Sequence, residues 1–130
     1  MSSAVAGLAR SGAVHGTFAF VAMGAWAAFA NRGHGFEAMA PAFVIQGAIS
    51  CVITLILKRS LEAMFARLHG PVAIAAPPLV TMTVVLAVLF TIHKLAGTPE
   101  IWTTIAVPYA VSSSYAWIYT VILARTSKPS

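Results

Sequence analysis

The sequence carries little charge and very little acid. Only 8% of its 130 residues are charged, aspartate is absent, and the acidic residues are Glu37, Glu62 and Glu100. Apolar residues make up 59% of the chain and the mean hydropathy is +0.87. Soluble domains carry about 25% charged residues. Because so few charges could not cover a soluble surface, the composition predicts an integral membrane protein.

Cysteine is equally scarce. Cys51 is the one cysteine and lies within an apolar run. A single cysteine excludes an intrachain disulfide and a cysteine cluster for metal. We expect it to act as a small packing residue.

The residues that carry most enzyme chemistry are too few to form an active site. The sequence has no nucleophile, base and acid set, no glycine-rich phosphate loop and no H-E-x-x-H motif. His34 and His93 could meet at one side of a membrane, but no neighbouring carboxylate or cysteine would complete a metal or haem site with them. The sequence therefore predicts a protein that is not an enzyme and has no metal and no cofactor.

Four apolar runs are long enough to cross a bilayer, which takes about 20 residues. They cover residues 13–31, 39–57, 74–95 and 100–124, and the third run begins at either Pro71 or Pro77. Glycine or proline in the first and third connections indicates tight turns. The sequence predicts one all-α domain, residues 1–130, with four transmembrane helices as two antiparallel hairpins. A weak internal repeat relates residues 10–59 to residues 77–125.

A short basic segment separates the two predicted hairpins. Leu61, Met64, Phe65 and Leu68 follow helical spacing on one face, and the charged residues lie off that face. The pattern suits an amphipathic helix at the cytoplasmic bilayer surface. A solvated continuation of the preceding helix would give the same pattern, so both interpretations stay open.

The basic residues predict the orientation of the chain. Six lysines and arginines fall on one side of the four spans, including Arg10, Lys58, Arg59 and Lys128, against Arg32 and Lys94 on the other side. Positive residues favour the cytoplasm. We expect a multi-pass protein of the cell inner membrane with both termini cytoplasmic. The +5 formal charge forms no basic face, so no nucleic-acid partner is expected.

Small residues mark a packing face on the first span. Gly12 and Gly16 form one small-xxx-small pair, and Gly24 and Ala28 form another. Such pairs let helix backbones approach closely in lipid. The face could pack against the other helices of the same chain or against a second copy.

Polar residues within the spans give the candidate substrate site. Gln46, Ser50 and Thr54 recur every four residues and form one stripe on the second span. In the fourth span, Pro108 removes a backbone donor and is followed by Tyr109, Ser112 and Ser113, which could form a polar notch or could rescue the freed carbonyl. We select Gln46, Ser50, Pro108, Tyr109, Ser112 and Ser113 as candidate substrate-binding residues.

Two classes of function remain after these exclusions. Glu37, Glu62 and Glu100 all lie in connections or at the ends of spans, which excludes transport that exchanges protons at a carboxylate buried within a span. The polar stripe and the broken fourth span favour an oligomeric transporter or channel-like protein for a small or amphipathic solute. The alternative is a non-catalytic accessory or assembly subunit of a larger membrane complex. The expected partners are membrane lipid and either further copies of the chain or a larger complex.

Overall fold

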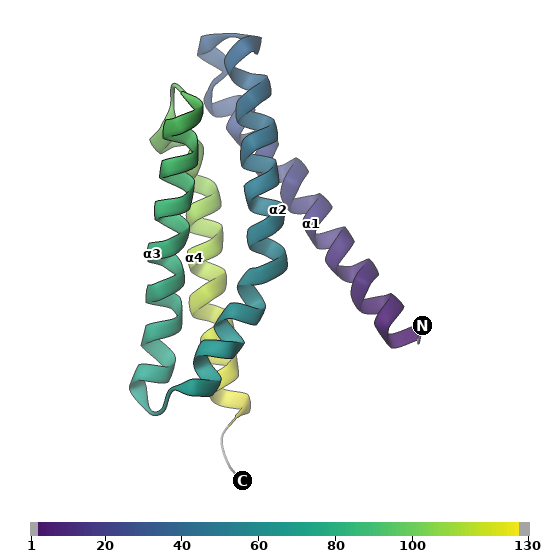
Figure 1. The fold of residues 1–130 in the computed structure, drawn as a ribbon, viewed down its shortest axis with the longest axis vertical. Helices are drawn as coiled ribbons and strands as arrows, with labels where there is room; N and C mark the ends of the chain where they lie inside the picture. Colours follow the sequence, from purple (N-terminus) through teal and green to yellow (C-terminus); the bar gives the residue numbers. More distant parts are fainter. Residues whose placement is uncertain (1–2, 128–130) are drawn as a thin grey trace.

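The protein is all-helical, with four long helices (Figure 1). The computed structural model describes the backbone of residues 3–127 and the side chains of residues 11–127. Its helices are α1 (Ser3–Ala30), α2 (Phe36–Arg67), α3 (Pro71–Ala96) and α4 (Ile101–Thr126), with a short 3-10 helix, η1 (Arg32–His34), between α1 and α2. Each of the four contains a segment long and apolar enough to span a membrane. The prediction of an all-α protein with four such helices is confirmed.

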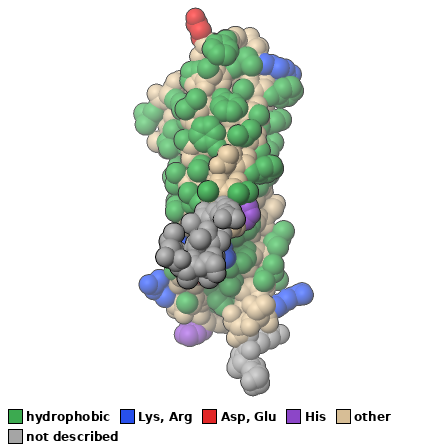
Figure 2. Space-filling model, turned by 90° about the vertical axis from the view of Figure 1, so that its right-hand side faces the viewer, with side chains coloured by type: hydrophobic (Ala, Val, Ile, Leu, Met, Phe, Trp, Pro, Cys, Tyr) green, Lys and Arg blue, Asp and Glu red, His purple; other side chains and the backbone are tan. Residues whose placement is uncertain are grey.

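Consecutive helices run in opposite directions, so the molecule has two ends (Figure 1). We call the end that holds η1 and the α3–α4 turn the Glu100 end, and the end that holds the α2–α3 turn the Arg67 end. Hydrophobic side chains dominate the middle of the visible face, and charged side chains lie toward its ends (Figure 2). This distribution matches a protein whose middle lies in hydrocarbon. Arg10 and Lys128, which contribute to the predicted orientation, have side chains outside the described residues.

Helices α1 and α2 pack through alternating small and large residues. A Cβ atom on Gly24 would lie 2.8 Å from the Phe43 carbonyl oxygen, and one on Gly47 would lie 2.8 Å from the Phe20 carbonyl oxygen. One turn further along, a Cβ atom on Gly16 would lie 3.0 Å from the Cys51 sulfur. Each glycine therefore accepts the bulkier residue opposite, and the two backbones approach closely.

Helices α2, α3 and α4 enclose the main hydrophobic core. Ile49, Val85, Leu89 and Ile105 form its buried centre, and Tyr109 packs against it. A second cluster nearer the Arg67 end joins Leu57 and Leu61 of α2 to Ala116 of α4. Helix α1 lies outside this arrangement, and its N-terminal end points away from the other three helices (Figure 1).

The structure gives two helix boundaries that the sequence leaves open, the end of α2 and the beginning of α3. The second predicted span ends at Leu57, but α2 continues to Arg67 because Leu61 is fully buried against α4 and holds the extra turns in place. Helix α3 begins at Pro71, with Gly70 before it, so Pro77 and Pro78 lie inside the helix. The Thr81 hydroxyl donates to the carbonyl oxygens of both prolines at 2.9 and 3.1 Å.

Candidate solute site

A chain of four buried polar side chains joins α2 to the end of α3. His93 Nε2 lies 2.9 Å from Gln46 Oε1, His93 Nδ1 lies 2.8 Å from Thr98 Oγ1, and Gln46 Nε2 donates to Ser50 Oγ at 2.8 Å. Gln46 and His93 are fully shielded, and Ser50 and Thr98 are buried. Buried polar groups are costly unless hydrogen-bonded, so each member fixes its neighbour.

The Gln46 amide fixes the direction of two of these hydrogen bonds. Its nitrogen donates to Ser50 and its oxygen can only accept, so His93 Nε2 donates to Gln46. The polar chain runs from Thr98, at the Glu100 end, to Ser50, near the middle of α2.

Ser50 also lines a cavity of about 230 Å³ between α1, α2 and α4. We call this cavity the wedge. Its apolar wall comes mainly from α1, through Phe18, Ala22 and Met23, and its polar groups are Ser50 and Thr54 of α2, Ser112 of α4 and His15 of α1. The wedge thus combines an apolar side with three hydroxyls and one imidazole.

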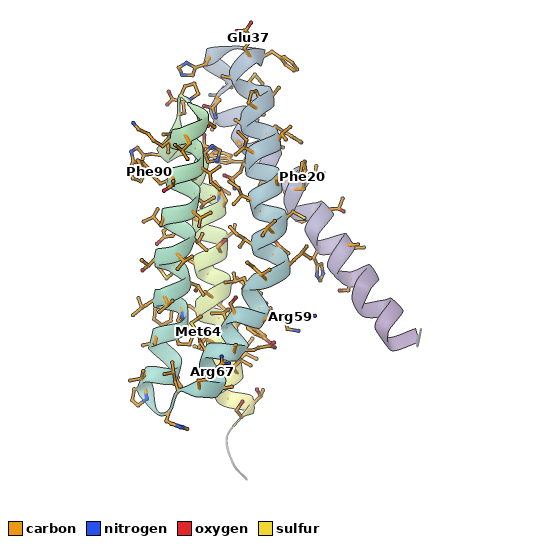
Figure 3. The ribbon with its side chains drawn as sticks, viewed as in Figure 1. Phe20, Glu37, Arg59, Met64, Arg67 and Phe90 are labelled. Atoms are coloured by element: carbon orange, nitrogen blue, oxygen red, sulfur yellow. The ribbon has the colours of Figure 1, made fainter. Side chains whose placement is uncertain are left out.

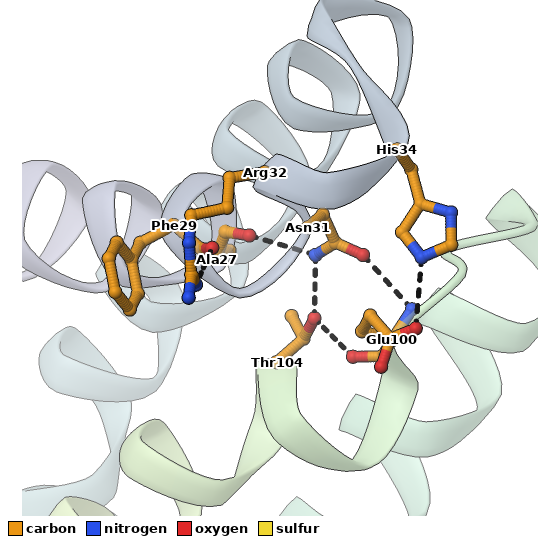
Figure 4. Close-up of polar contacts among 7 residues, drawn as sticks. All are labelled: Ala27, Phe29, Asn31, Arg32, His34, Glu100 and Thr104. Carbon is orange, nitrogen blue, oxygen red and sulfur yellow. Dashed lines mark hydrogen bonds and ion pairs between the residues drawn. The ribbon is translucent and has the colours of Figure 1, made fainter.

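The wedge exists because α1 is tied to α4 at the Glu100 end. Trp26 Nε1 donates to the Thr103 carbonyl at 2.9 Å. Asn31 is fully buried, donates to Thr104 Oγ1 at 2.8 Å and accepts from the Glu100 backbone N–H at 3.0 Å (Figure 4). Toward its N-terminus, α1 diverges from the bundle (Figure 1). We call the contacts of Asn31 with Thr104 and Glu100 the Asn31 clasp.

A hydrogen-bonded pair of exposed side chains lies beside the Asn31 clasp. His34 Nε2 is 2.9 Å from Glu100 Oε2, and both side chains are 45% exposed (Figure 4). Exposed pairs contribute little, typically about 0–1 kcal/mol. The buried amide of Asn31, rather than this pair, therefore holds α1 against α4. His34 and His93 thus have separate partners and do not form a common site.

The structure divides the candidate substrate-binding residues into two groups. Ser50, Pro108 and Ser112 come together at the wedge. Gln46 lies behind Ser50, Tyr109 packs on the hydrophobic core, and Ser113 Oγ is buried without a hydrogen-bond partner within the described part of the chain. The polar stripe predicted on α2 and the polar notch predicted on α4 therefore meet at the wedge, through Ser50 and Ser112.

The small residues of α1 pack against α2. Gly16 and Gly24 are buried against α2, and Gly12 lies 3.6 Å from the Leu55 side chain, measured from the position of a Cβ atom. Ala28 is half-buried one turn beyond Gly24. This face packs within the chain, so it is not free for a second copy.

Three polar residues of the site were missed from the sequence. His93 was considered only as a metal ligand, and Asn31 only as the end of a span. His15 lines the wedge and is not among the candidate residues selected from the sequence. The available signal was Gln46: a buried amide needs partners, and His93 is the imidazole that reaches it.

A third polar cluster lies at the Arg67 end. The Tyr119 hydroxyl donates to the Glu62 carboxylate, the Tyr115 ring stacks on Tyr119, and Lys58 Nζ lies 6.0 Å from the centroid of the Tyr119 ring. Glu62 therefore joins the last turns of α2 to α4. The contact complements the burial of Leu61 in holding this part of α2 against the bundle.

Comparisons with protein-family models, with curated proteins and with solved structures return no match. The fold and composition define the class: a helical membrane protein with four candidate spans.

Proposed function

We propose that this protein transports a small amphipathic solute that binds in the wedge, and that it does so as a homo-oligomer in the cell inner membrane. The observation that carries the proposal is the composition of the wedge, in which an apolar wall from α1 faces the hydroxyls of Ser50 and Ser112. Ligand sites are mostly apolar with a few placed polar groups.

The proposed topology consists of two antiparallel hairpins with the Arg67 end in the cytoplasm. The excess of lysine and arginine at that end supports this orientation. The last turns of α2, from about Lys58 to Arg67, then lie at the cytoplasmic surface of the bilayer, with Leu61 turned into the bundle.

The polar groups of the wedge favour a neutral or acidic head on the solute. The wedge has no carboxylate, so a cationic head would find no counter-charge. Hydroxyls can donate or accept, and the imidazole of His15 can donate to an acidic group. Phe18, Ala22 and Met23 would contact the apolar part of the solute.

The buried polar chain gives the wedge a rigid back wall. The Ser50 oxygen accepts a hydrogen bond from the Gln46 amide, so the Ser50 hydroxyl can donate its proton to a solute. The same chain extends polar groups from the wedge to Thr98 at the Glu100 end. Because α1 is clasped at that end, movement of its other half would open the wedge to the cytoplasmic side.

A single chain does not surround a path across the membrane. The wedge is lined by α1, α2 and α4, and α1 diverges from the other helices toward its N-terminus (Figure 1). Further copies would have to supply the missing wall, and this is why we propose a homo-oligomer.

Flux measurements in proteoliposomes test the proposal. Radiolabelled octanoate, benzoate and indole would serve as probes with acidic or neutral heads. Ser112→Leu places a bulky apolar side chain in the wedge, and Ser114→Leu is the matched control because Ser114 is exposed and does not line the wedge. We expect flux of at least one probe above that of empty vesicles, lost in Ser112→Leu and kept in Ser114→Leu.

Absence of flux for all three probes from a folded oligomer would contradict the proposal. So would equal flux in the two leucine variants. Either result would favour the alternative function, an accessory or assembly subunit of a larger membrane complex.

A further inference from the structure

A second and larger cavity lies on the other side of α2, between α2 and α3. It has a volume of about 750 Å³, within the roughly 300–1,000 Å³ typical of ligand sites. We call it the α2–α3 groove. Val52 and Ile56 of α2 face Val80, Val84 and Val88 of α3 across it. The groove shares Ile53 and not the polar residues of the wedge, so it is a separate site.

The groove offers a ligand no polar partner along its length. Its two hydroxyls are already engaged within their own helices: Ser60 donates to the Ile56 carbonyl at 3.0 Å and Thr81 to the Pro77 carbonyl at 2.9 Å. The part of α2 that lines it, from Ala48 to Met64, is roughly 24 Å long at about 1.5 Å per residue. Such a surface accepts a long hydrocarbon chain.

A cation lies at the Arg67 end of this groove. Arg67 Nη1 donates to the carbonyl of Ala63, a residue that lines the groove, at 3.3 Å. Arg67 follows Ser60, Ala63 and Met64 at helical spacing, on the same face of α2. Within the described residues, the guanidinium makes no ion pair. Its other N–H donors can therefore bind an external anion.

The start of α3 adds to this positive corner. Helix α3 begins at Pro71, after the turn of Leu68 to Gly70 that follows Arg67. The N-terminus of a helix carries a partial positive charge that favours anions. An anionic group placed beside Arg67 would therefore meet two favourable contributions at the mouth of the groove.

The walls of the groove disfavour a second protein helix as the occupant. Close helix packing in membranes uses small residues, and here most of the wall is valine and isoleucine. Gly16 and Gly24 of α1 and Gly47 of α2 are already used between those two helices. Flexible hydrocarbon can fill the spaces between branched side chains where a rigid helix cannot.

We propose that the α2–α3 groove binds an anionic phospholipid, with an acyl chain along the valine and isoleucine walls and the phosphate on Arg67. This inference is independent of solute transport. The lipid would lie in the cytoplasmic leaflet if the Arg67 end is cytoplasmic, and it would brace α2 against α3 at the side opposite the wedge.

Native mass spectrometry of the full chain tests the proposal. The protein would be extracted from nanodiscs that contain equal amounts of phosphatidylglycerol and phosphatidylcholine, and the lipids retained on each protein would be counted. Arg67→Gln removes the cation. Arg59→Gln is the matched control, because Arg59 lies on the side of α2 away from α3 (Figure 3). Val84→Trp fills the groove at an exposed position of α3.

We expect the wild type to retain phosphatidylglycerol preferentially. Arg67→Gln should reduce that retention about fivefold, the effect expected for one basic residue at an anionic lipid surface, while Arg59→Gln keeps it. Val84→Trp should reduce retention of both lipids with no loss of thermal stability in detergent.

Three results would overturn the proposal. Equal losses in the two arginine variants would indicate a general surface-charge effect. Unchanged retention in Val84→Trp would place the lipid elsewhere. A dimer that Val84→Trp dissociates would show that a second copy of the chain occupies the groove.

Discussion

His93 Nε2 lies 2.9 Å from Gln46 Oε1, and both side chains are fully shielded although they come from different helices. This contact is the centre of the polar chain that ends at Ser50 and the wedge. A polar contact in such a place serves first to hold α2 and α3 in register, because an unpartnered imidazole or amide in an apolar interior is costly.

Replacement of Gln46 by leucine should therefore act on stability. Gln46→Leu removes two hydrogen bonds, each worth about 0.6 kcal/mol on average in membranes, and leaves His93 Nε2–H unpartnered. We expect a loss of about 2–4 kcal/mol, since a buried unsatisfied donor adds about 1–3 kcal/mol of its own. Thermal unfolding in detergent measures it. Thr83→Val is the control because Thr83 is exposed and bonds only within α3.

A double-mutant cycle identifies the source of that loss. If the contact acts as described, Gln46→Leu combined with His93→Leu should cost less than the sum of the two single changes. Additive costs would show that the two side chains stabilise the bundle independently.

Gly24→Leu should separate α1 from α2. A side chain at Gly24 meets the Phe43 backbone oxygen at 2.8 Å, and backbone cannot yield as a flexible side chain does. We expect a destabilisation of at least about 1–3 kcal/mol, the usual range for overpacking. Gly16→Leu should act in the same direction, since its nearest neighbour is the Cys51 sulfur at 3.0 Å.

Gly33→Ala provides the control for both glycine variants. A Cβ atom at Gly33 meets no atom within 4 Å, and Gly33 is not among the glycines with positive φ. Thermal stability and recovery of folded protein should match the wild type. If the leucine variants are also unchanged, the close α1–α2 contact is refuted.

The sequence predicts the glycine packing face of α1 but not the helix that packs against it. Gly12, Gly16 and Gly24 are recognisable as a packing face, but their partner is not. The partner emerges only when α2 is aligned against α1, so that Phe43 meets Gly24 and Phe20 meets Gly47. This register depends on the turn at η1, whose geometry the sequence does not specify.

The four spans follow from composition because the bilayer imposes their length and polarity. The continuation of α2 beyond Leu57 is one of the two interpretations that the sequence leaves open, because Lys58 and Arg59 interrupt the apolar run. In the structure, Leu61 and Glu62 hold this part of the helix against α4. The polar residues of the second and fourth spans suggest a site, but the apolar wall of the wedge comes from α1, and the position of α1 beside α4 depends on tertiary contacts such as those of Trp26 with Thr103 and Asn31 with Thr104. The internal repeat stays a prediction.

Asn31 should contribute far more than the neighbouring pair of His34 and Glu100. Asn31→Ala removes the buried bonds to Thr104 and to the Glu100 backbone, and leaves the Glu100 N–H without its side-chain acceptor, while the Thr104 hydroxyl keeps its bond to the Glu100 carbonyl. Glu100→Gln keeps the backbone bond and alters only an exposed pair. We expect a loss of about 2–3 kcal/mol for Asn31→Ala and under about 1 kcal/mol for Glu100→Gln. Unfolding measurements in detergent distinguish them, and equal losses would refute the clasp.

Reporter fusions test the proposed topology. A reporter at Ser130 and one inserted between Arg59 and His69 should both report cytoplasm, because the excess of lysine and arginine lies at that end. A reporter in the turn at Gly97 should report the opposite side. An external signal from either of the first two positions would overturn the orientation.

The most direct test of the transport site is to close the wedge reversibly. Ala19 of α1 and Val111 of α4 both line the wedge, and replacing each with cysteine in a Cys51→Ser background allows an oxidative cross-link between the two helices. A matched pair, Glu62→Cys with Tyr119→Cys, places a cross-link between α2 and α4 at the Arg67 end, where the two side chains are already in contact and do not line the wedge. Flux of the probe solutes should be lost in the oxidised wedge variant, restored by reductant, and unaffected by oxidation of the matched pair. Full flux through a wedge variant that is completely cross-linked would contradict the proposed site.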